Sequence, residues 1–263
     1  MRLNQYIAHH SKYSRREADR LIADGKVSIN KEVIRDFFYQ VDDDAKVYVD
    51  GKRLKVSDEY TVIVYNKPKG ELVTKKDDRG RKTIYETLPK KFSHFLPVGR
   101  LDFSSEGLLL LSDSTFVVTA LMESKLEREY ILKVSGFIKD EVFDAMEQGI
   151  VLSDAKKGAH KKSKITSMEF APFCGYQVIK NTAKYSKIKV IINEGKNREL
   201  RRFFAYFNLE ILDLRRIGYG FVNLNNLPLG KVRFLQRGEY NKLHAFLREI
   251  KDERNTLKSK NKS

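Results

Sequence analysis

The spacing of apolar and polar residues near the N-terminus predicts two short helices. A first apolar stripe consists of Leu3, Ile7 and Ala8. Ser14 and Glu17 then form a capping box, in which the side chain of each residue accepts a hydrogen bond from the backbone amide of the other. The second helix is expected to end at Gly25, a favourable residue just past a helix. Its buried face consists of Ala18, Leu21 and Ile22.

Short alternating segments after this helix predict strands. The segment KVSIN (26–30) is strand-like, and AKVYVDGKRL (45–54) predicts a hairpin with Asp50-Gly51 at its turn. We therefore expect residues 1–57 to form a small unit of its own, with a hinge near 57–60.

Residues 58–240 mix strands and short helices without strict alternation. Helical patterns are expected at 138–149 and 196–208. Strands are expected in DEYTVIVYN (58–66), GLLLLSD (107–113), REYILKVSG (128–136), KITSMEF (164–170) and SKIKVIINEG (186–195). This order predicts an α+β domain with a large, mainly antiparallel sheet flanked by helices and loops. The basic loop 154–164 is expected to be mobile, and 241–263 to be a helix that fades into a disordered, lysine-rich tail.

Composition narrows the class of partner. The formal net charge of +16 favours a polyanion, either nucleic acid or an acidic membrane face. There is no apolar run of about 18 residues and no apolar signal segment, so no membrane association is expected. A single cysteine, Cys174, favours a reducing compartment and a cytoplasmic location. The histidines show no metal-ligand spacing, so no metal is expected.

Gly99-Arg100-Leu101-Asp102 is the first of three segments that could carry chemistry. Asp102 comes shortly before Leu108–Leu111, four apolar residues in a row. An isolated aspartate before a strand is usually a cap or a turn residue.

The second segment, residues 194–204, contains the start of the helix predicted at 196–208. Its apolar stripe consists of Leu200, Phe203, Phe204 and Phe207. Arg198 and Arg202 are expected on the opposite, solvent-facing side. Arg201 lies about 100° from Leu200, at the margin of the core. There it is either a half-buried cation that needs an acidic partner or a surface arginine whose stem packs on phenylalanines.

The third segment, Glu127 to Val134, places Tyr130 at the start of a strand. This tyrosine is either a core residue or a platform for stacking a base. The chain lacks the sequence signatures of other enzyme classes. It has no G-x-S-x-G elbow, no P-loop and no Rossmann glycine fingerprint.

Together and in order, these segments resemble one family, the RsuA/RluB-type pseudouridine synthases. The resemblance covers residues 1–237 and begins with an RNA-binding module of the ribosomal-protein-S4 type. Its motifs are NKPKG (66–70), GRLD (99–102) with GLLL (107–110), REY (128–130) and EGKNRELRR (194–202). Segments 67–72, 78–90, 127–130 and 197–199 are more similar to the RluB branch, which modifies large-subunit rRNA.

The resemblance implies roles for individual residues. Asp102 matches the catalytic nucleophile, Tyr130 the residue that packs on the flipped uracil, and Arg201 the cation paired with the aspartate. The residues implied to bind substrate are Arg100, Leu200, Lys67 and Arg198. This sequence departs from the family pattern at Ser105, where threonine is usual, and at Ser114, where glycine is frequent. Both departures are expected to affect turn geometry rather than the chemistry.

The implied activity converts a uridine of ribosomal RNA to pseudouridine, in 23S rRNA near the peptidyl-transferase centre. No cofactor is expected, because the reaction involves no redox change and loses no group. Asp102 must be ionised to attack, and Arg201 is the cation that would keep it so. Alternatives are a 16S rRNA enzyme of the RsuA branch, a non-catalytic rRNA-binding assembly factor, and a DNA-binding regulator.

RNA contacts are also expected from the N-terminal S4-like unit. The candidate residues are Arg2, Arg15, Arg16, Arg20 and Lys26. Charge on a helix face is as often simply solvated, so composition alone leaves phosphate binding and solvation equally open. The partner is expected to be ribosomal RNA or an assembly intermediate, and the enzyme a monomer, because nothing in the sequence demands a dimer.

Overall fold

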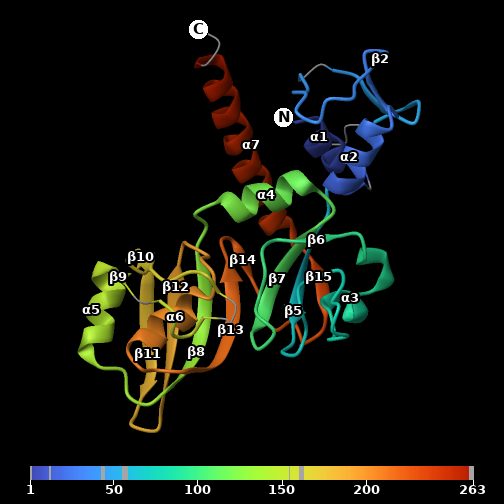
Figure 1. Ribbon diagram of the computed structural model, residues 1–263. Helices are drawn as coiled ribbons and strands as arrows, with labels where there is room; N and C mark the ends of the chain where they lie inside the picture. Colours follow the sequence, from blue (N-terminus) through green and yellow to red (C-terminus); the bar gives the residue numbers. More distant parts are fainter. Residues whose placement is uncertain are drawn as a thin grey trace.

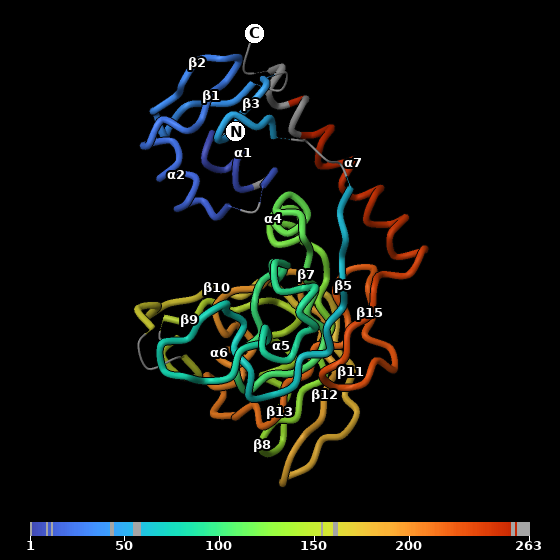
Figure 2. The backbone as a smooth tube through the Cα atoms, turned by 90° about the vertical axis from the view of Figure 1, so that its right-hand side faces the viewer, coloured from blue at the N-terminus to red at the C-terminus, as the bar shows by residue number. Residues whose placement is uncertain are grey.

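The computed structural model describes residues 2–11, 13–42, 45–54, 59–153, 155–159 and 163–260. A small N-terminal unit lies beyond helix α4, on the far side from the large sheet (Figures 1 and 2). Residues 57 and 58 of the predicted hinge at 57–60 lie outside the described residues.

The N-terminal unit packs two helices against a four-stranded sheet of order β2-β1-β3-β4. Its elements are α1 (Leu3–His10), α2 (Arg15–Ala23), β1 (Val27–Ile29), β2 (Glu32–Val33), β3 (Val47–Val49) and β4 (Lys52–Arg53). The predicted capping box at Ser14 and Glu17 is present. Asp50 and Gly51 both have positive φ, which is the geometry of the predicted two-residue hairpin.

The large sheet has nine strands, with the order β11-β12-β8-β13-β7-β5-β15 and two short strands at its side. The strands are β5 (Val62–Lys67), β6 (Leu96–Pro97), β7 (Glu106–Ser112), β8 (Arg128–Ser135), β11 (Gly175–Asn181), β12 (Tyr185–Ile192), β13 (Ile211–Tyr219), β14 (Val222–Asn223) and β15 (Val232–Phe234). Strands β7 and β13 run parallel and join the two halves, whereas the other named strand pairs in the described part of the chain are antiparallel. The mixed α/β fold and the mainly antiparallel sheet were predicted.

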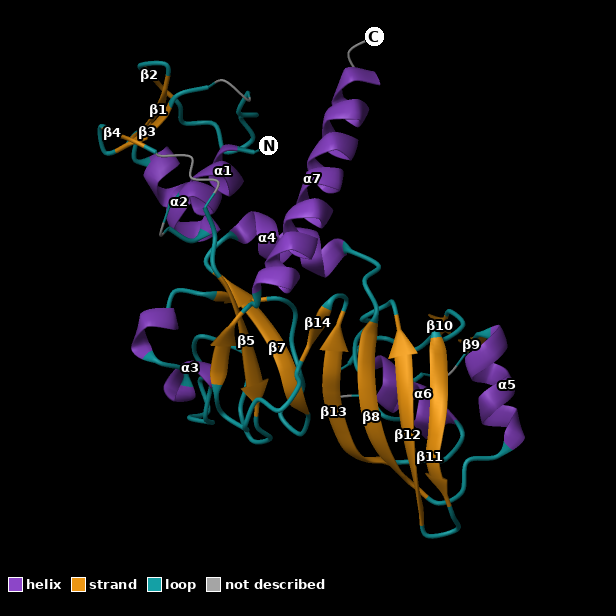
Figure 3. Cartoon of the chain, turned by 180° about the vertical axis from the view of Figure 1, so that it is seen from behind, coloured by secondary structure: helices purple, strands orange, loops and turns teal. Residues whose placement is uncertain are grey.

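The remaining elements flank this sheet. They are α3 (Ile84–Thr87), the 3-10 turn Lys90–Phe92, α4 (Thr115–Glu123), α5 (Asp140–Gln148), β9 (Ile150–Leu152), β10 (Met168–Phe170), α6 (Glu199–Tyr206) and α7 (Arg237–Lys260). Seen from behind, strands β13, β8, β12 and β11 lie in front of α6, so α6 covers one face of this half of the sheet (Figure 3).

Several elements were not predicted from the sequence, among them α4, β11 and β13. Strand β13 was not predicted, because Arg215 and Arg216 interrupt its apolar pattern, yet it lies at the centre of the sheet. The C-terminal helix begins at Arg237, before the predicted boundary at 241. Its Leu243 and Leu247 are buried against Val62 and other core residues, so this half of the helix belongs to the large domain. The predicted tail at 261–263 lies outside the described residues.

Candidate active site

A cavity of about 380 Å³ opens where the two halves of the sheet meet. Its lining includes the loop before β7, the start of β8 and the beginning of α6, together with residues from the end of α4, the end of β12 and strand β13. The predicted residues among its lining are Arg100, Asp102, Tyr130, Arg198, Leu200 and Arg201. These residues come from segments separated by up to 101 positions, so the fold gathers six of the seven predicted catalytic and substrate-binding residues around one space.

The loop that carries Asp102 is held on both sides by buried groups. Leu101 is buried before it, and strand β7 follows with the fully packed residues Leu108–Leu111. The Ser105 amide donates to the Asp102 carbonyl at 3.0 Å, which closes a turn. The carboxylate stays about one-third exposed, because the turn directs it away from the leucines and into the cavity.

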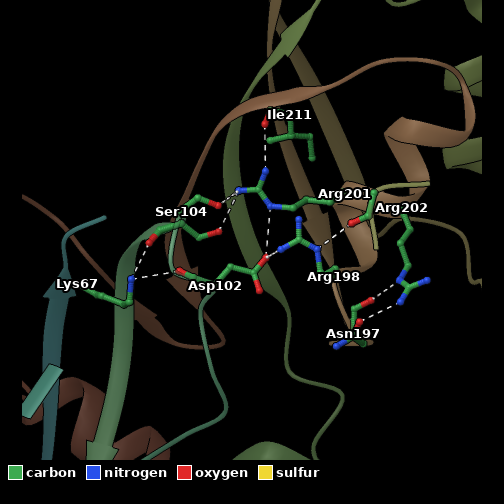
Figure 4. Close-up of polar contacts among 10 residues, drawn as sticks. Lys67, Asp102, Ser104, Asn197, Arg198, Arg201, Arg202 and Ile211 are labelled. Atoms are coloured by element: carbon green, nitrogen blue, oxygen red, sulfur yellow. Dashed lines mark hydrogen bonds and ion pairs between the residues drawn. The ribbon is translucent and has the colours of Figure 1, made fainter. Parts of the chain in front are cut away.

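Lys67 supports this loop from inside the protein. Its side chain is fully buried, and its Nζ donates to the Pro68 carbonyl at 2.9 Å. The same Nζ donates to the carbonyls of Asp102 and Ser105 at 3.2 and 2.9 Å (Figure 4). Burial lowers the pKa of Lys67 to about 8, although Glu71 and Asp102 attract its charge. The expectation that Lys67 binds substrate is therefore wrong in this geometry: all three contacts are to the backbone, and Lys67 does not line the cavity.

Two arginines from the start of α6 meet the carboxylate. Arg198 Nη1 lies 2.9 Å and Arg201 Nε 3.3 Å from the same oxygen of Asp102, Oδ2 (Figure 4). The predicted pairing of Arg201 with an acid is present, and Arg198 is a second, closer partner that the sequence did not indicate.

Arg201 is also fixed by neutral groups. Its Nη1 donates to the Ile211 carbonyl at 3.0 Å, and its Nη2 donates to the hydroxyls of Ser104 and Ser105 at 3.1 and 3.3 Å. Burial lowers the pKa of Arg201, and Asp102 acts in the opposite direction. The Ser105 contact corrects the expectation that this departure lies outside the chemistry. Ser114 instead caps α4, where its hydroxyl accepts from the Val117 amide.

Arg198 has an unusual backbone. It precedes α6 with φ 51° and ψ 33°, in the left-handed region of backbone conformation that residues other than glycine rarely adopt. Such a conformation costs about 1–3 kcal/mol and persists only where the surroundings enforce it. Here it directs the guanidinium to Asp102 instead of along the helix.

The floor of the cavity is apolar and aromatic. Tyr130 is 8% and Leu200 4% exposed, and both line the space, whereas Arg100 is exposed at its edge. Tyr130 is thus both a core residue and part of the cavity wall, which leaves its ring available to one flat ligand.

Sequence reasoning missed several lining residues. Arg128 is buried and donates to the Asn193 carbonyl and the Tyr219 hydroxyl, both at 3.1 Å. Glu199 is also buried, which raises its pKa, and it accepts from the Lys196 amide. A charged residue beside the buried positions of a strand or a helix was the available signal.

Arg202 was expected on the solvent-facing side of α6, and this expectation is wrong. Its side chain is fully buried and donates to Ala155, Asn197 and Ser163. Segments 155–159 and 163–165 cover this face of the helix. Ala155 and Ser163 of the predicted mobile loop make these contacts, and the mobility of the loop stays a prediction.

The predicted RNA-contacting residues of the N-terminal unit lie away from the cavity. Arg15, Arg16 and Arg20 are exposed along α2. Lys26 lies 3.8 Å from Asp24, and Arg2 lies over the exposed ring of Phe38 at 5.1 Å. None of these five lines the cavity.

The sequence matches known families in both parts. Residues 61–206 match the RNA pseudouridylate synthase family, and residues 1–45 match the S4 domain. The chain belongs to the RNA pseudouridylate synthase family. It is therefore an RNA pseudouridine synthase, an isomerase that carries an S4 domain. Recognition of this family from the sequence motifs is confirmed.

Relatives extend the match over nearly the whole chain. An uncharacterized RNA pseudouridine synthase of Helicobacter pylori is 58% identical over 94% of this chain and 95% of its own length. Ribosomal large subunit pseudouridine synthase B of Bacillus subtilis is 32% identical over 93% of this chain and 96% of its own. A crystal structure of a pseudouridylate synthase shares the fold, with a TM-score of 0.61 and 23% identity over 92% of this chain and 99% of that one.

Within the described part of the chain, no group of three or more histidine, cysteine, aspartate or glutamate side chains is arranged to hold a metal ion. No helix there is long and apolar enough to cross a membrane.

Proposed function

We propose that this enzyme isomerises a uridine of large-subunit ribosomal RNA, with Asp102 as the nucleophile. The observation that carries the proposal is the carboxylate at the cavity mouth, paired through Oδ2 with two arginines. Its other oxygen, Oδ1, makes no hydrogen bond to the residues that the structure describes. An ionised carboxylate with one anchored and one open oxygen is suited to attack.

The cavity supports binding of one extruded base. A uridine inside folded RNA must leave its stack, which costs a few kcal/mol. Tyr130 and Leu200 offer an apolar wall on which the uracil ring can lie, and stacking offsets part of that cost. Arg100 is exposed at the edge, where it can occupy the place that the base has left.

The reaction balances without a cofactor. The bond between uracil N1 and ribose C1′ breaks, the base turns, and C5 bonds to C1′. The hydrogen on C5 leaves as a proton and N1 gains a proton. In either route open to the carboxylate, addition to the base or attack at C1′, a covalent intermediate divides a difficult step into two easier ones.

Arg198 and Arg201 keep the Asp102 carboxylate in place through this sequence. Arginine is suited to the task because it stays protonated and binds carboxylates through fixed N–H groups. Lys67 holds the backbone of the same loop, so the nucleophile is supported on two sides.

The proposal of a large-subunit target rests on similarity. Several relatives about 30% identical across most of this chain carry the name ribosomal large subunit pseudouridine synthase B. The exposed arginines of α2 then serve as phosphate contacts that bring the RNA to the cavity.

The test compares Asp102→Asn with the wild type. We expect the variant to bind an rRNA fragment with unchanged affinity and to lose pseudouridine formation by roughly a thousandfold or more. Chemical mapping of pseudouridine in rRNA from cells with and without the gene identifies the target. Retained activity in Asp102→Asn would overturn the nucleophile, and a lost site in 16S rather than 23S rRNA would overturn the target.

A further inference from the structure

The segment 155–159 lies against the beginning of α6 and touches the cation that holds the nucleophile. Arg198 Nε donates to the Gly158 carbonyl at 2.8 Å, and Nη1 of the same guanidinium reaches Asp102 at 2.9 Å. One planar group thus joins this segment to the catalytic carboxylate. The position of the Gly158 carbonyl therefore determines how the guanidinium is oriented.

Arg202 fixes the segment from the other side. Its guanidinium donates to the Ala155 carbonyl and to the Ser163 hydroxyl, the latter at 2.7 Å. It also donates to Asn197 Oδ1 at 3.0 Å and to the Asn197 carbonyl at 2.9 Å. The buried arginine therefore ties both flanks of the segment to the residue just before Arg198.

Gly158 makes the close approach possible. Its φ is +70°, and a Cβ atom there would lie 2.3 Å from the Arg201 carbonyl oxygen and 3.0 Å from the Arg202 amide. Real Cβ atoms do not come so close to backbone, so a side chain would displace either the segment or the start of α6.

We infer that Gly158 and its segment are a positioning element for the reaction, which sets Arg198 against Asp102 without touching substrate. Gly158 does not line the cavity, so its effect is transmitted through Arg198. The inference rests on the proposed role of Asp102. A displacement of about 1 Å in a catalytic constellation can cost on the order of a hundredfold in rate.

The experiment compares Gly158→Ala with Gly80→Ala. Gly80 has nearly the same φ, +69°, but a Cβ there meets nothing within 4 Å, so this control carries the backbone strain without the displacement. With an rRNA fragment as substrate, Gly158→Ala should lower kcat by about tenfold to a hundredfold. KM should change less than about twofold, since RNA contacts are untouched. Gly80→Ala should leave both at the wild-type value.

A double variant tests the route. If Gly158 acts through Arg198, adding Gly158→Ala to Arg198→Ala should lower kcat little further. A second loss as large as that seen on the wild type would overturn the inference, as would a folded Gly158→Ala with the kcat of Gly80→Ala.

Ser163→Ala keeps the inference testable should Gly158→Ala fail to fold. It removes one hydrogen bond to Arg202 and adds no bulk, so it should fold and lower kcat about threefold or more with KM unchanged. Wild-type kcat in this variant would overturn the inference. Asp102→Asn, measured in parallel, separates the two proposals, because its retained activity would refute the nucleophile whatever Gly158 does.

Discussion

Two helices of this chain, α2 and α6, have arginines near their start, and the arginines of the two helices differ in burial. Along α2, Arg15, Arg16 and Arg20 are exposed to solvent. Around the start of α6, Arg198 and Arg201 are mostly buried against a carboxylate, and Arg202 is fully buried. Exposed charges act over distance and are screened by salt, whereas buried ones act through fixed contacts. Net charge therefore indicates the kind of partner, whereas burial distinguishes the arginines that pair with Asp102 from those that face solvent.

Arg202 should show the largest effect on stability. Its replacement in Arg202→Met leaves the carbonyls of Ala155 and Asn197 and the Ser163 hydroxyl without their charged donor. We expect the free energy of unfolding to fall by about 3 kcal/mol or more, measured by urea denaturation.

The matched control is Arg16→Met on α2, which removes the same charge from an exposed site. It should change the free energy of unfolding by less than about 0.5 kcal/mol. Equal losses in the two variants would remove the distinction between the two helices.

Lys67 is a further buried cation, and its effect on stability should depend on pH. Burial lowers its pKa from 10.5 to about 8, so between these values the unfolded chain holds more protons than the folded one. The contribution of Lys67 to the free energy of unfolding therefore rises with pH across this window, by roughly 2–3 kcal/mol. Urea denaturation at steps from pH 7 to 10.5 should show this gain in the wild type relative to Lys67→Met.

Catalytic activity should fall as the pH rises through about 8, whereas the free energy of unfolding rises. A neutral amine has two N–H donors for three carbonyls, so one of the three hydrogen bonds of Lys67 is lost as pH rises through about 8.

The stability prediction is contradicted if the free energies of unfolding of wild type and Lys67→Met change in parallel with pH across this window.

The α2 arginines should have the smallest effect on the protein and a specific effect on RNA binding. In the triple variant Arg15→Ala, Arg16→Ala and Arg20→Ala, kcat at saturating RNA should stay unchanged. The slope of log affinity against log salt should become shallower by about 0.7–0.9 per lost phosphate contact. A control that replaces Lys139, Lys184 and Lys187 with alanine changes the net charge equally. The same slope for both variants would mean that α2 has no special contact.

Local patterns were sufficient for the N-terminal unit. The capping box at Ser14 and the hairpin at Asp50-Gly51 depend on neighbouring residues, and both are present. The leucines at 108–111 likewise form the expected strand. The position of Arg201 at the edge of its stripe left open a half-buried cation or a surface arginine, and the ion pair with Asp102 agrees with the first alternative.

Contacts from distant segments were beyond a reading of local pattern. A helical wheel assigns Arg202 to solvent because it assumes that only one side of the helix is covered, whereas residues 155–159 and 163–165 cover the other. Lys67 looks like a surface residue beside Pro68-Lys69 until the Asp102 loop folds over it. Strand β13 is hidden by its arginines, and its central place follows only from pairing with β7 and β8.

The parallel pairing of β7 with β13 also means that the cavity is completed late in the chain. Gly107 of β7 lies so near the Arg216 carbonyl of β13 that a Cβ would stand 2.1 Å from its oxygen, so the two halves of the sheet close tightly at this point. Asp102 leaves the ribosome 96 residues ahead of Arg198, and β13 follows later still. The cavity therefore stays incomplete until β13, which contributes Leu214, Arg216 and Tyr219 to its lining, has paired with β7.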